Sequence, residues 1–186
     1  MKILCFLLAL LITGCAEAHP RDYALRLEFE RGTCSGTAVG RNIVLTAEHC
    51  WMGGRLLRIN GQDAYAMKIV KDGKDHALVR VTMQFDKWAT LGEAPKQADR
   101  VRWYGNPASQ PDLYREGYVL RTDADEVWID AHAFGGDSGS GLYDQRGRVV
   151  AVLSGIKTWR TLTGLHFDVV IAYRLAFTRE DWEAVA

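Results

Sequence analysis

Short apolar or alternating runs, separated by Gly, Asp and Asn, make up most of this chain. The runs are YALRLEF (23–29), NIVLTA (42–47), RLLRI (55–59), AYAMKIV (64–70), HALVRV (76–81), RVRWY (100–104), EVWIDA (126–131), RVVAVLSG (148–155) and LTGLHFDVV (162–170). Such runs at intervals of roughly ten residues are typical of short antiparallel strands. The sequences RING (58–61) and KDGKD (71–75) have the composition of turns between them. The pattern predicts an all-β sandwich or barrel.

At the end of the chain, the spacing of the apolar residues changes. In residues 171–186, IAYRLAFTREDWEAVA, apolar residues recur at helical spacing. Thr178 has the residue type and place of a helix cap, and Glu180 and Asp181 follow it as acids of a first turn. We expect a C-terminal helix packed on the β-structure.

The length and the charge balance of the chain limit the classes of function to consider. The chain has 186 residues, of which 48% are hydrophobic and 25% charged, enough for one well-packed domain. Its 23 Lys and Arg balance 23 Asp and Glu, and no run of like charge stands out. Nucleic acid is therefore not expected as a partner.

The first fifteen residues, MKILCFLLALLITGC, read as a targeting segment. One Lys precedes an apolar run from Ile3 to Ile12, about half of the roughly twenty residues that a membrane-spanning helix needs. We therefore predict a signal peptide over 1–14, a tether over 15–22 and the folded domain over 23–186.

Residues 12–15, ITGC, resemble the bacterial lipobox, which implies that Cys15 carries lipid after export. Because Ala16 rather than Asp follows, the resemblance implies the periplasmic side of the outer membrane as the destination. The alternative is an ordinary signal peptide cleaved after Ala16 or Ala18, which would leave the protein periplasmic or secreted.

The cysteines divide between these regions. Cys5 would leave with the signal peptide and Cys15 would carry the lipid, so Cys34 and Cys50 remain in a compartment that permits disulfides. One disulfide between them is the simplest prediction, and two free thiols are the alternative.

Three polar residues suggest nucleophilic chemistry. A serine nucleophile needs a base, usually His, and a carboxylate that orients it. His49 follows a predicted strand, and Ser138 lies in GGDSGSG. Asp75 precedes another predicted strand, and Asp72 and His76 are nearby alternatives for its role. Each could be an ordinary turn residue, but the order His, Asp, Ser predicts a serine hydrolase.

The surrounding blocks resemble the trypsin-like (chymotrypsin-fold) serine peptidases. These blocks are CSGT (34–37) with TAEHC (46–50), DHALV (75–79), GGDSGS (135–140) and the strand VAVLSG (150–155). The resemblance implies two packed six-stranded antiparallel β-barrels, roughly 23–90 and 91–175, and a disulfide between Cys34 and Cys50. It also implies hydrolysis of protein or peptide substrates without a metal or organic cofactor.

The same resemblance implies a role for each motif residue. His49 would take the proton of Ser138, Asp75 would hold the histidine tautomer, and Ser138 would attack the peptide carbonyl. The backbone N–H groups of Gly136 and Ser138 would form the oxyanion hole.

The substrate-binding side chains depart from the tryptic pattern. The resemblance implies substrate contacts for His132, Ser154 and Gly155, with His132 at the pocket floor, six residues before Ser138. Because His132 is not an acid, a preference for Lys or Arg is not supported. His132 with His166 would favour an acidic or polar side chain, unless both are strand histidines bonded within the barrel.

Asp137, just before the nucleophile, lacks an evident partner. Many animal members of the family pair this acid with a newly cut N-terminal ammonium, but an Ile-Val-Gly-Gly activation site is missing here. Arg31, Arg41, Lys157 or a local backbone amide could replace the ammonium, or Asp137 stays solvated, or the oxyanion turn does not form.

Two functions are compatible with these alternatives for Asp137. The first is an exported serine endopeptidase, and the second is a catalytically inactive binding module at the membrane surface. An α/β-hydrolase esterase is disfavoured, because in that class the serine precedes the acid and the histidine.

Overall fold

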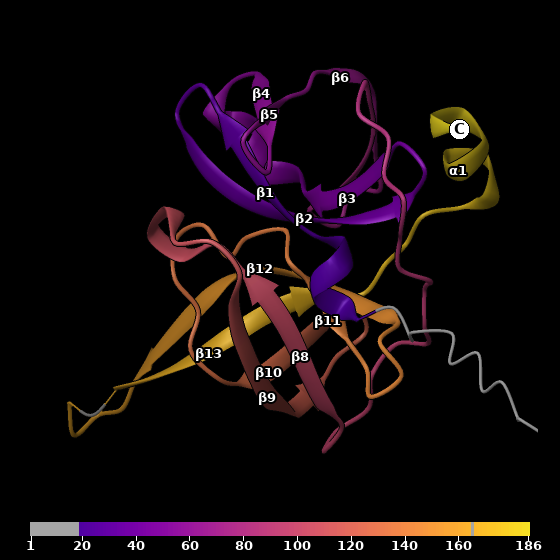
Figure 1. The fold of residues 1–186 in the computed structure, drawn as a ribbon. Helices are drawn as coiled ribbons and strands as arrows, with labels where there is room; N and C mark the ends of the chain where they lie inside the picture. Colours follow the sequence, from indigo (N-terminus) through magenta and orange to yellow (C-terminus); the bar gives the residue numbers. More distant parts are fainter. Residues whose placement is uncertain (1–18, 165) are drawn as a thin grey trace, which may run out of the picture.

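Two antiparallel β-sheets, one from each half of the chain, make up the computed structural model, which describes residues 19–164 and 166–186 (Figure 1). The expected all-β architecture with two barrel-like halves and a C-terminal helix is confirmed. The N-terminal half has seven strands rather than six, and the additional one contains two residues.

The N-terminal sheet has the spatial order β5-β4-β1-β2-β3-β7-β6. Its strands are β1 (Ala24–Phe29), β2 (Gly32–Gly40), β3 (Ile43–Ala47), β4 (Leu56–Ile59), β5 (Gln62–Asp63), β6 (Ala66–Lys71) and β7 (His76–Val81). Leu27, Leu45 and Ile59 are among the fully buried side chains of its core.

The C-terminal sheet closes into a six-stranded barrel, β10-β13-β12-β11-β8-β9. Its strands are β8 (Arg100–Gly105), β9 (Leu113–Thr122), β10 (Glu126–Asp130), β11 (Gly141–Tyr143), β12 (Val149–Arg160) and β13 (His166–Tyr173). Trp103, Ile129 and Leu153 are buried in a separate core. The described residues thus form two hydrophobic clusters, and the cluster of the N-terminal half also includes Tyr143, Val149 and Val152 from the C-terminal half.

The predicted C-terminal helix is α1 (Arg179–Val185), capped by the Thr178 side chain as expected. It is shorter than the apolar pattern indicated, because residues up to Tyr173 belong to β13. Val185 is fully buried in the core of the N-terminal sheet, against which α1 packs (Figure 1). The C-terminal segment thus joins the two halves.

Three short 3-10 helices complete the fold, η1 (Pro20–Tyr23), η2 (Glu48–Gly53) and η3 (Pro107–Ser109). Within the expected tether (15–22), Pro20 is buried against the domain, whereas His19, Arg21 and Asp22 are exposed. The signal peptide (1–14), Cys15 and the cleavage points at Ala16 and Ala18 lie outside the described residues. Of the helices described, none is long and apolar enough to cross a membrane.

The predicted disulfide is present, joining Cys34 on β2 to Cys50 on η2 with an S–S distance of 2.12 Å. Cys50 is buried and lies next to His49 in the chain. The bond therefore fastens the short helix that carries His49 to the central strand of the N-terminal sheet.

Candidate active site

Strand register brings His49 and Asp75 together. Residues Ala47 of β3 and His76 of β7 are paired, so the residues just beyond them lie side by side. The Glu48 N–H donates to the Asp75 carbonyl at 2.9 Å, and the His49 N–H donates to Asp75 Oδ1 at 3.0 Å. Asp75 itself has φ 64°, a left-handed conformation that Asp tolerates better than most residues.

The His49 ring is held by the same carboxylate. Its Nδ1 lies 2.8 Å from Asp75 Oδ2 and 3.1 Å from Oδ1. Since an ionised carboxylate can only accept, Nδ1 carries a proton, and in the neutral imidazole Nε2 is the acceptor. Burial raises the pKa of Asp75, but hydrogen bonds from His49 and Ser154 outweigh it and hold the pKa below its ordinary value.

Ser138 lies on a turn between the two sheets. Its carbonyl accepts the N–H of Ser35 on β2 at 2.8 Å, and the Gly139 N–H donates to the Leu153 carbonyl on β12 at 2.8 Å. Ser138 Oγ donates to the Ser154 carbonyl at 3.1 Å. Among the described residues, no hydrogen bond joins Ser138 Oγ to His49.

Ser154 connects the three predicted residues. Its carbonyl accepts from Ser138 Oγ, and its own hydroxyl donates to Asp75 Oδ2. Ser138, Ser154, Asp75 and His49 thus form one chain of hydrogen bonds. In substrate-free active sites the bond from nucleophile to base often forms only in the complex, so this arrangement is compatible with a triad.

Two backbone N–H groups of the turn are unused. Within the described residues, neither the Gly136 nor the Ser138 N–H donates to a protein acceptor. Gly136 has φ 106°, and a Cβ there would lie 2.3 Å from the Asn106 carbonyl oxygen, so only glycine fits. The predicted oxyanion donors are therefore free to bind a ligand.

Asp137 is fully buried and pairs with Arg115 on β9, whose Nη1 lies 2.7 Å from Asp137 Oδ2. The Phe134 N–H also donates to this oxygen at 2.9 Å. None of the three cations considered from the sequence, Arg31, Arg41 and Lys157, is the partner. The Phe134 N–H is a local backbone amide, which was one of the partners for Asp137 considered from the sequence.

Arg115 holds the segment before Ser138 at two further points. Its Nη1 donates to the His132 carbonyl at 3.1 Å, and its guanidinium lies 5.1 Å from the centroid of the Phe134 ring. Burial raises the pKa of Asp137, and the Phe134 N–H and the Arg115 charge oppose that rise. Arg115 is therefore the cation that pairs with Asp137 in this structure.

The predicted substrate-binding residues lie at different places. Gly155 on β12 is paired with Ile171. Ser154, the residue before it, belongs to the hydrogen-bonded cluster with Asp75 and Ser138. His132 is an exposed residue after β10, not a strand histidine. His166 begins β13, five residues from Ile171, which corresponds to roughly 16 Å along the strand. The backbone thus separates His166 from Gly155.

The competing pair Asp72 and His76 is structural. His76 Nδ1 lies 2.6 Å from Asp72 Oδ2, with both side chains 1% exposed, and His76 Nε2 lies 3.2 Å from the Tyr173 carbonyl. The Ala176 N–H also donates to Asp72, at 3.2 Å. This pair anchors the segment that follows β13 to the N-terminal sheet.

Asp72→Asn should destabilise the fold in a pH-dependent way. Burial raises the pKa of Asp72, but the His76 hydrogen bond and charge outweigh it, so the folded pKa lies below 3.8. The stabilisation is therefore present above pH 3.8 and is lost as pH falls through the folded pKa. We expect the substitution to lower the free energy of unfolding by about 3 kcal/mol at neutral pH.

Urea denaturation at pH 7, 5 and 3 measures this difference, which should shrink at the lowest pH. The exposed Asp123→Asn is the matched control and should change stability little. A difference that stays constant over the three pH values would contradict the role given to the Asp72 charge.

Arg115→Met should leave the Asp137 carboxylate buried without its cation. We expect the free energy of unfolding to fall by about 3 kcal/mol. Because burial raises the pKa of Asp137, acid pH should protonate it and reduce this deficit. Thermal or urea unfolding at pH 7 and pH 5 measures the effect.

Arg121→Met removes a more exposed arginine from the same strand and serves as the control. Equal stability of the Arg115 and Arg121 variants would show that the Arg115 pair does not support the turn.

Comparison with known proteins agrees with this geometry. The sequence matches the trypsin-like peptidase domain family over residues 34–152. A search of curated protein sequences gave no significant match. A Glu endopeptidase in complex with MPD has a similar structure, with TM-score 0.68 and 16% identity over 91% of each chain.

The active form of the Rv3671c protease from M. tuberculosis is also similar, with TM-score 0.69 and 15% identity over 83% of this chain and 77% of that one. At these identities the likeness concerns the fold alone. The family match covers more than half of the sequence and includes the His49, Asp75 and Ser138 motifs. The chain therefore belongs to the family of trypsin-like peptidase domains.

Proposed function

We propose that this serine-type peptidase is an endopeptidase that cleaves proteins or peptides with His49, Asp75 and Ser138. The observation that carries the proposal is the shared hydrogen-bonded cluster. The Asp75 carboxylate accepts from His49 and from Ser154 Oγ, and the Ser154 carbonyl accepts from Ser138 Oγ. This cluster links three residues that are far apart in the sequence, and it supports the proposal that they act as nucleophile, base and acid.

In the first half of the reaction, the Ser138 hydroxyl turns from the Ser154 carbonyl to His49 Nε2. The O–H bond breaks, His49 takes the proton, and Oγ bonds to the substrate carbonyl carbon, whose π electrons move to oxygen. Collapse of this intermediate breaks the C–N bond, and His49 returns the proton to the leaving amine. Water, activated by His49, then hydrolyses the acyl-enzyme.

The Gly136 and Ser138 N–H groups would stabilise the oxyanion of both intermediates. Removal of one such donor typically costs about 3 kcal/mol of transition-state stabilisation. Asp75 remains ionised throughout and stabilises the protonated His49, consistent with its lowered pKa.

The Arg115 pair argues against the inactive binding module. That alternative rested on an unpartnered Asp137, which would leave the turn before Ser138 unformed. With Asp137 held by Arg115 and the Phe134 N–H, the turn needs no N-terminal ammonium. We infer activity without a proteolytic activation step.

Substrate would lie along the groups next to Ser138. We infer that Ser154 and Gly155 contact the substrate backbone and that His132 contributes to side-chain preference. Trp51 and Met52 line a depression together with His49 and Asp75. Met52 is 80% exposed, so an apolar substrate residue could cover it.

We further propose that the protein is exported and anchored by lipid at Cys15. The support is the apolar run ending at ITGC and a disulfide that suits an oxidising compartment. The packed part of the chain begins near His19, and four extended residues reach only about 14 Å. Such an anchor would keep the peptidase close to the membrane surface.

A fluorophosphonate should label the protein at Ser138 without prior proteolysis, because only an activated serine reacts. Ser138→Ala should abolish labelling and peptide hydrolysis. Asp75→Asn should lower kcat by about 10⁴-fold through loss of the productive tautomer. Asp72→Asn, at a temperature where it is folded, should retain kcat. Mass spectrometry of the labelled peptide and steady-state kinetics measure these effects.

Absence of labelling in the folded parent protein would overturn the peptidase proposal and favour the binding module. Equal loss of kcat in the Asp72 and Asp75 variants would show that the acid is misassigned.

Cys15→Ser should move the protein from the membrane fraction to the soluble fraction, because the lipid attachment point is lost. Fractionation of cells that express each form, followed by immunoblotting, measures the distribution. Cys5→Ser is the matched control and should leave the parent distribution unchanged. Membrane retention of the Cys15 variant would rule out this anchor.

A further inference from the structure

The peptide bond that carries the Gly136 N–H is held from its opposite side. The Gly135 carbonyl accepts the Ala108 N–H at 2.8 Å. In a planar trans peptide the carbonyl and the N–H point in opposite directions. A bond that fixes the Gly135 oxygen therefore fixes the direction of the Gly136 N–H, one of the two proposed oxyanion donors.

Ala108 belongs to η3, and this loop has an unfavourable backbone. Ala108 has φ 48° and Ser109 has φ 64°, both left-handed without being glycine. This conformation is unfavourable for a residue that carries a Cβ. The loop keeps this conformation only if surrounding contacts hold it. The residues that make these contacts therefore influence the direction of the Gly136 N–H.

Asn106 anchors the loop. It is 2% exposed, and its side-chain amide donates to the Leu25 carbonyl at 3.2 Å and to Ser35 Oγ at 2.8 Å. Its backbone N–H donates to the same Ser35 Oγ at 3.0 Å. The loop is thus fastened to β1 and β2 of the other sheet.

The fully buried Ser35 hydroxyl completes the arrangement. Both of its acceptor positions are occupied by donors from Asn106, so its single proton must go elsewhere. It goes to the Gly136 carbonyl, 2.8 Å away. The hydroxyl therefore fixes the peptide that follows Gly136, while η3 fixes the peptide before it.

We propose that Ser35 and Asn106 are positioning residues that hold the Gly136 N–H toward the reacting carbonyl. This inference rests on the proposed peptidase function. Neither side chain touches substrate, and both act through the Gly135–Gly136 and Gly136–Asp137 peptides. They are distinct from Arg115, which holds the same turn through the Asp137 carboxylate.

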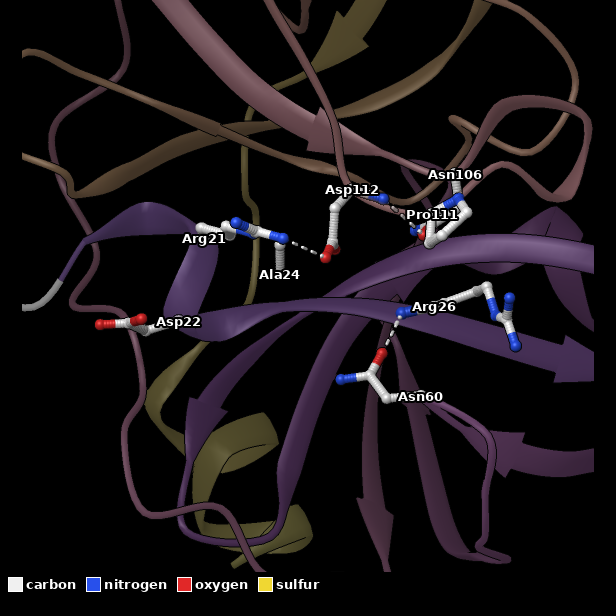
Figure 2. A pocket seen from close by; sticks show the side chains of 8 residues that line it. All are labelled: Arg21, Asp22, Ala24, Arg26, Asn60, Asn106, Pro111 and Asp112. Atoms are coloured by element: carbon white, nitrogen blue, oxygen red, sulfur yellow. Dashed lines mark hydrogen bonds and ion pairs between the residues drawn. The ribbon is translucent and has the colours of Figure 1, made fainter.

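The N-terminal segment approaches the same loop from outside (Figure 2). The Asp112 N–H donates to Asn106 Oδ1 at 3.4 Å, and Arg21 pairs with the Asp112 carboxylate at 3.2 Å. The Arg21 and Asp112 side chains are 63% and 43% exposed, so this ion pair contributes little. Asp112→Asn keeps the backbone and removes the charge, which makes it a matched control.

Ser35→Ala should lower kcat on a peptide substrate by about tenfold to a hundredfold, because the oxyanion donor is no longer held in place. KM should change by less than about threefold, since the substrate-contacting groups are intact. A peptide aldehyde, which forms an oxyanion with Ser138, should lose affinity by the same factor as kcat. Asp112→Asn should stay within about twofold of the parent in all three quantities.

Parent-like kcat and aldehyde affinity in folded Ser35→Ala would overturn the inference while leaving the peptidase proposal intact. If Ser35→Ala does not fold, Asn106→Ala is measured in the same way, with the same two outcomes.

The Gly136 amide gives a test that does not depend on turnover. In ¹⁵N-labelled Ser35→Ala its resonance should shift or broaden relative to the parent, whereas in Asp112→Asn it should not. An unchanged Gly136 resonance in Ser35→Ala would overturn the positioning role. A parent protein that hydrolyses nothing would instead refute the proposed function, and the resonance would still decide the positioning role.

Discussion

The buried Asp137 carboxylate sets the condition that the rest of the site must meet. A carboxylate without exposure to water is tolerated only with a cation or strong hydrogen bonds, and here Arg115 and the Phe134 N–H supply them to Oδ2, while Oδ1 has no hydrogen-bond partner among the described residues. Because Asp137 precedes Ser138, the contacts of its Oδ2 also set the path of the turn. The free Gly136 and Ser138 N–H groups follow from that path.

The site lies where the two sheets meet, and both sheets hold it. The N-terminal sheet contributes His49 and Asp75 through the pairing of β3 with β7, and Ser35 through β2. The C-terminal barrel contributes the Ser138 turn and Ser154. Hydrogen bonds such as Ser35 N–H to the Ser138 carbonyl cross between them, so the position of either sheet affects the cluster.

Sequence periodicity predicted most strands, and it missed those without a strong apolar signal. Strand β2 is rich in small residues, and β9 (LYREGYVLRT) mixes exposed charges with few buried side chains. Arg115 lies on β9, so the missed strand is also why the cation that holds Asp137 was not among those considered. Ser35 and Asn106 were missed because buried serine and asparagine have the residue types of ordinary turns.

By itself the sequence determined the all-β class, the capped C-terminal helix, the Cys34–Cys50 disulfide and the order of the His49, Asp75 and Ser138 motifs. These properties depend on local patterns and on residue types at short spacing. Only the tertiary structure decided that Arg115 pairs with Asp137, that Asp72 belongs to His76, and that Ser35 holds the Gly136 carbonyl. Contacts such as Ser35 with Gly136 join residues 101 positions apart, and strand pairing rather than periodicity selects such partners.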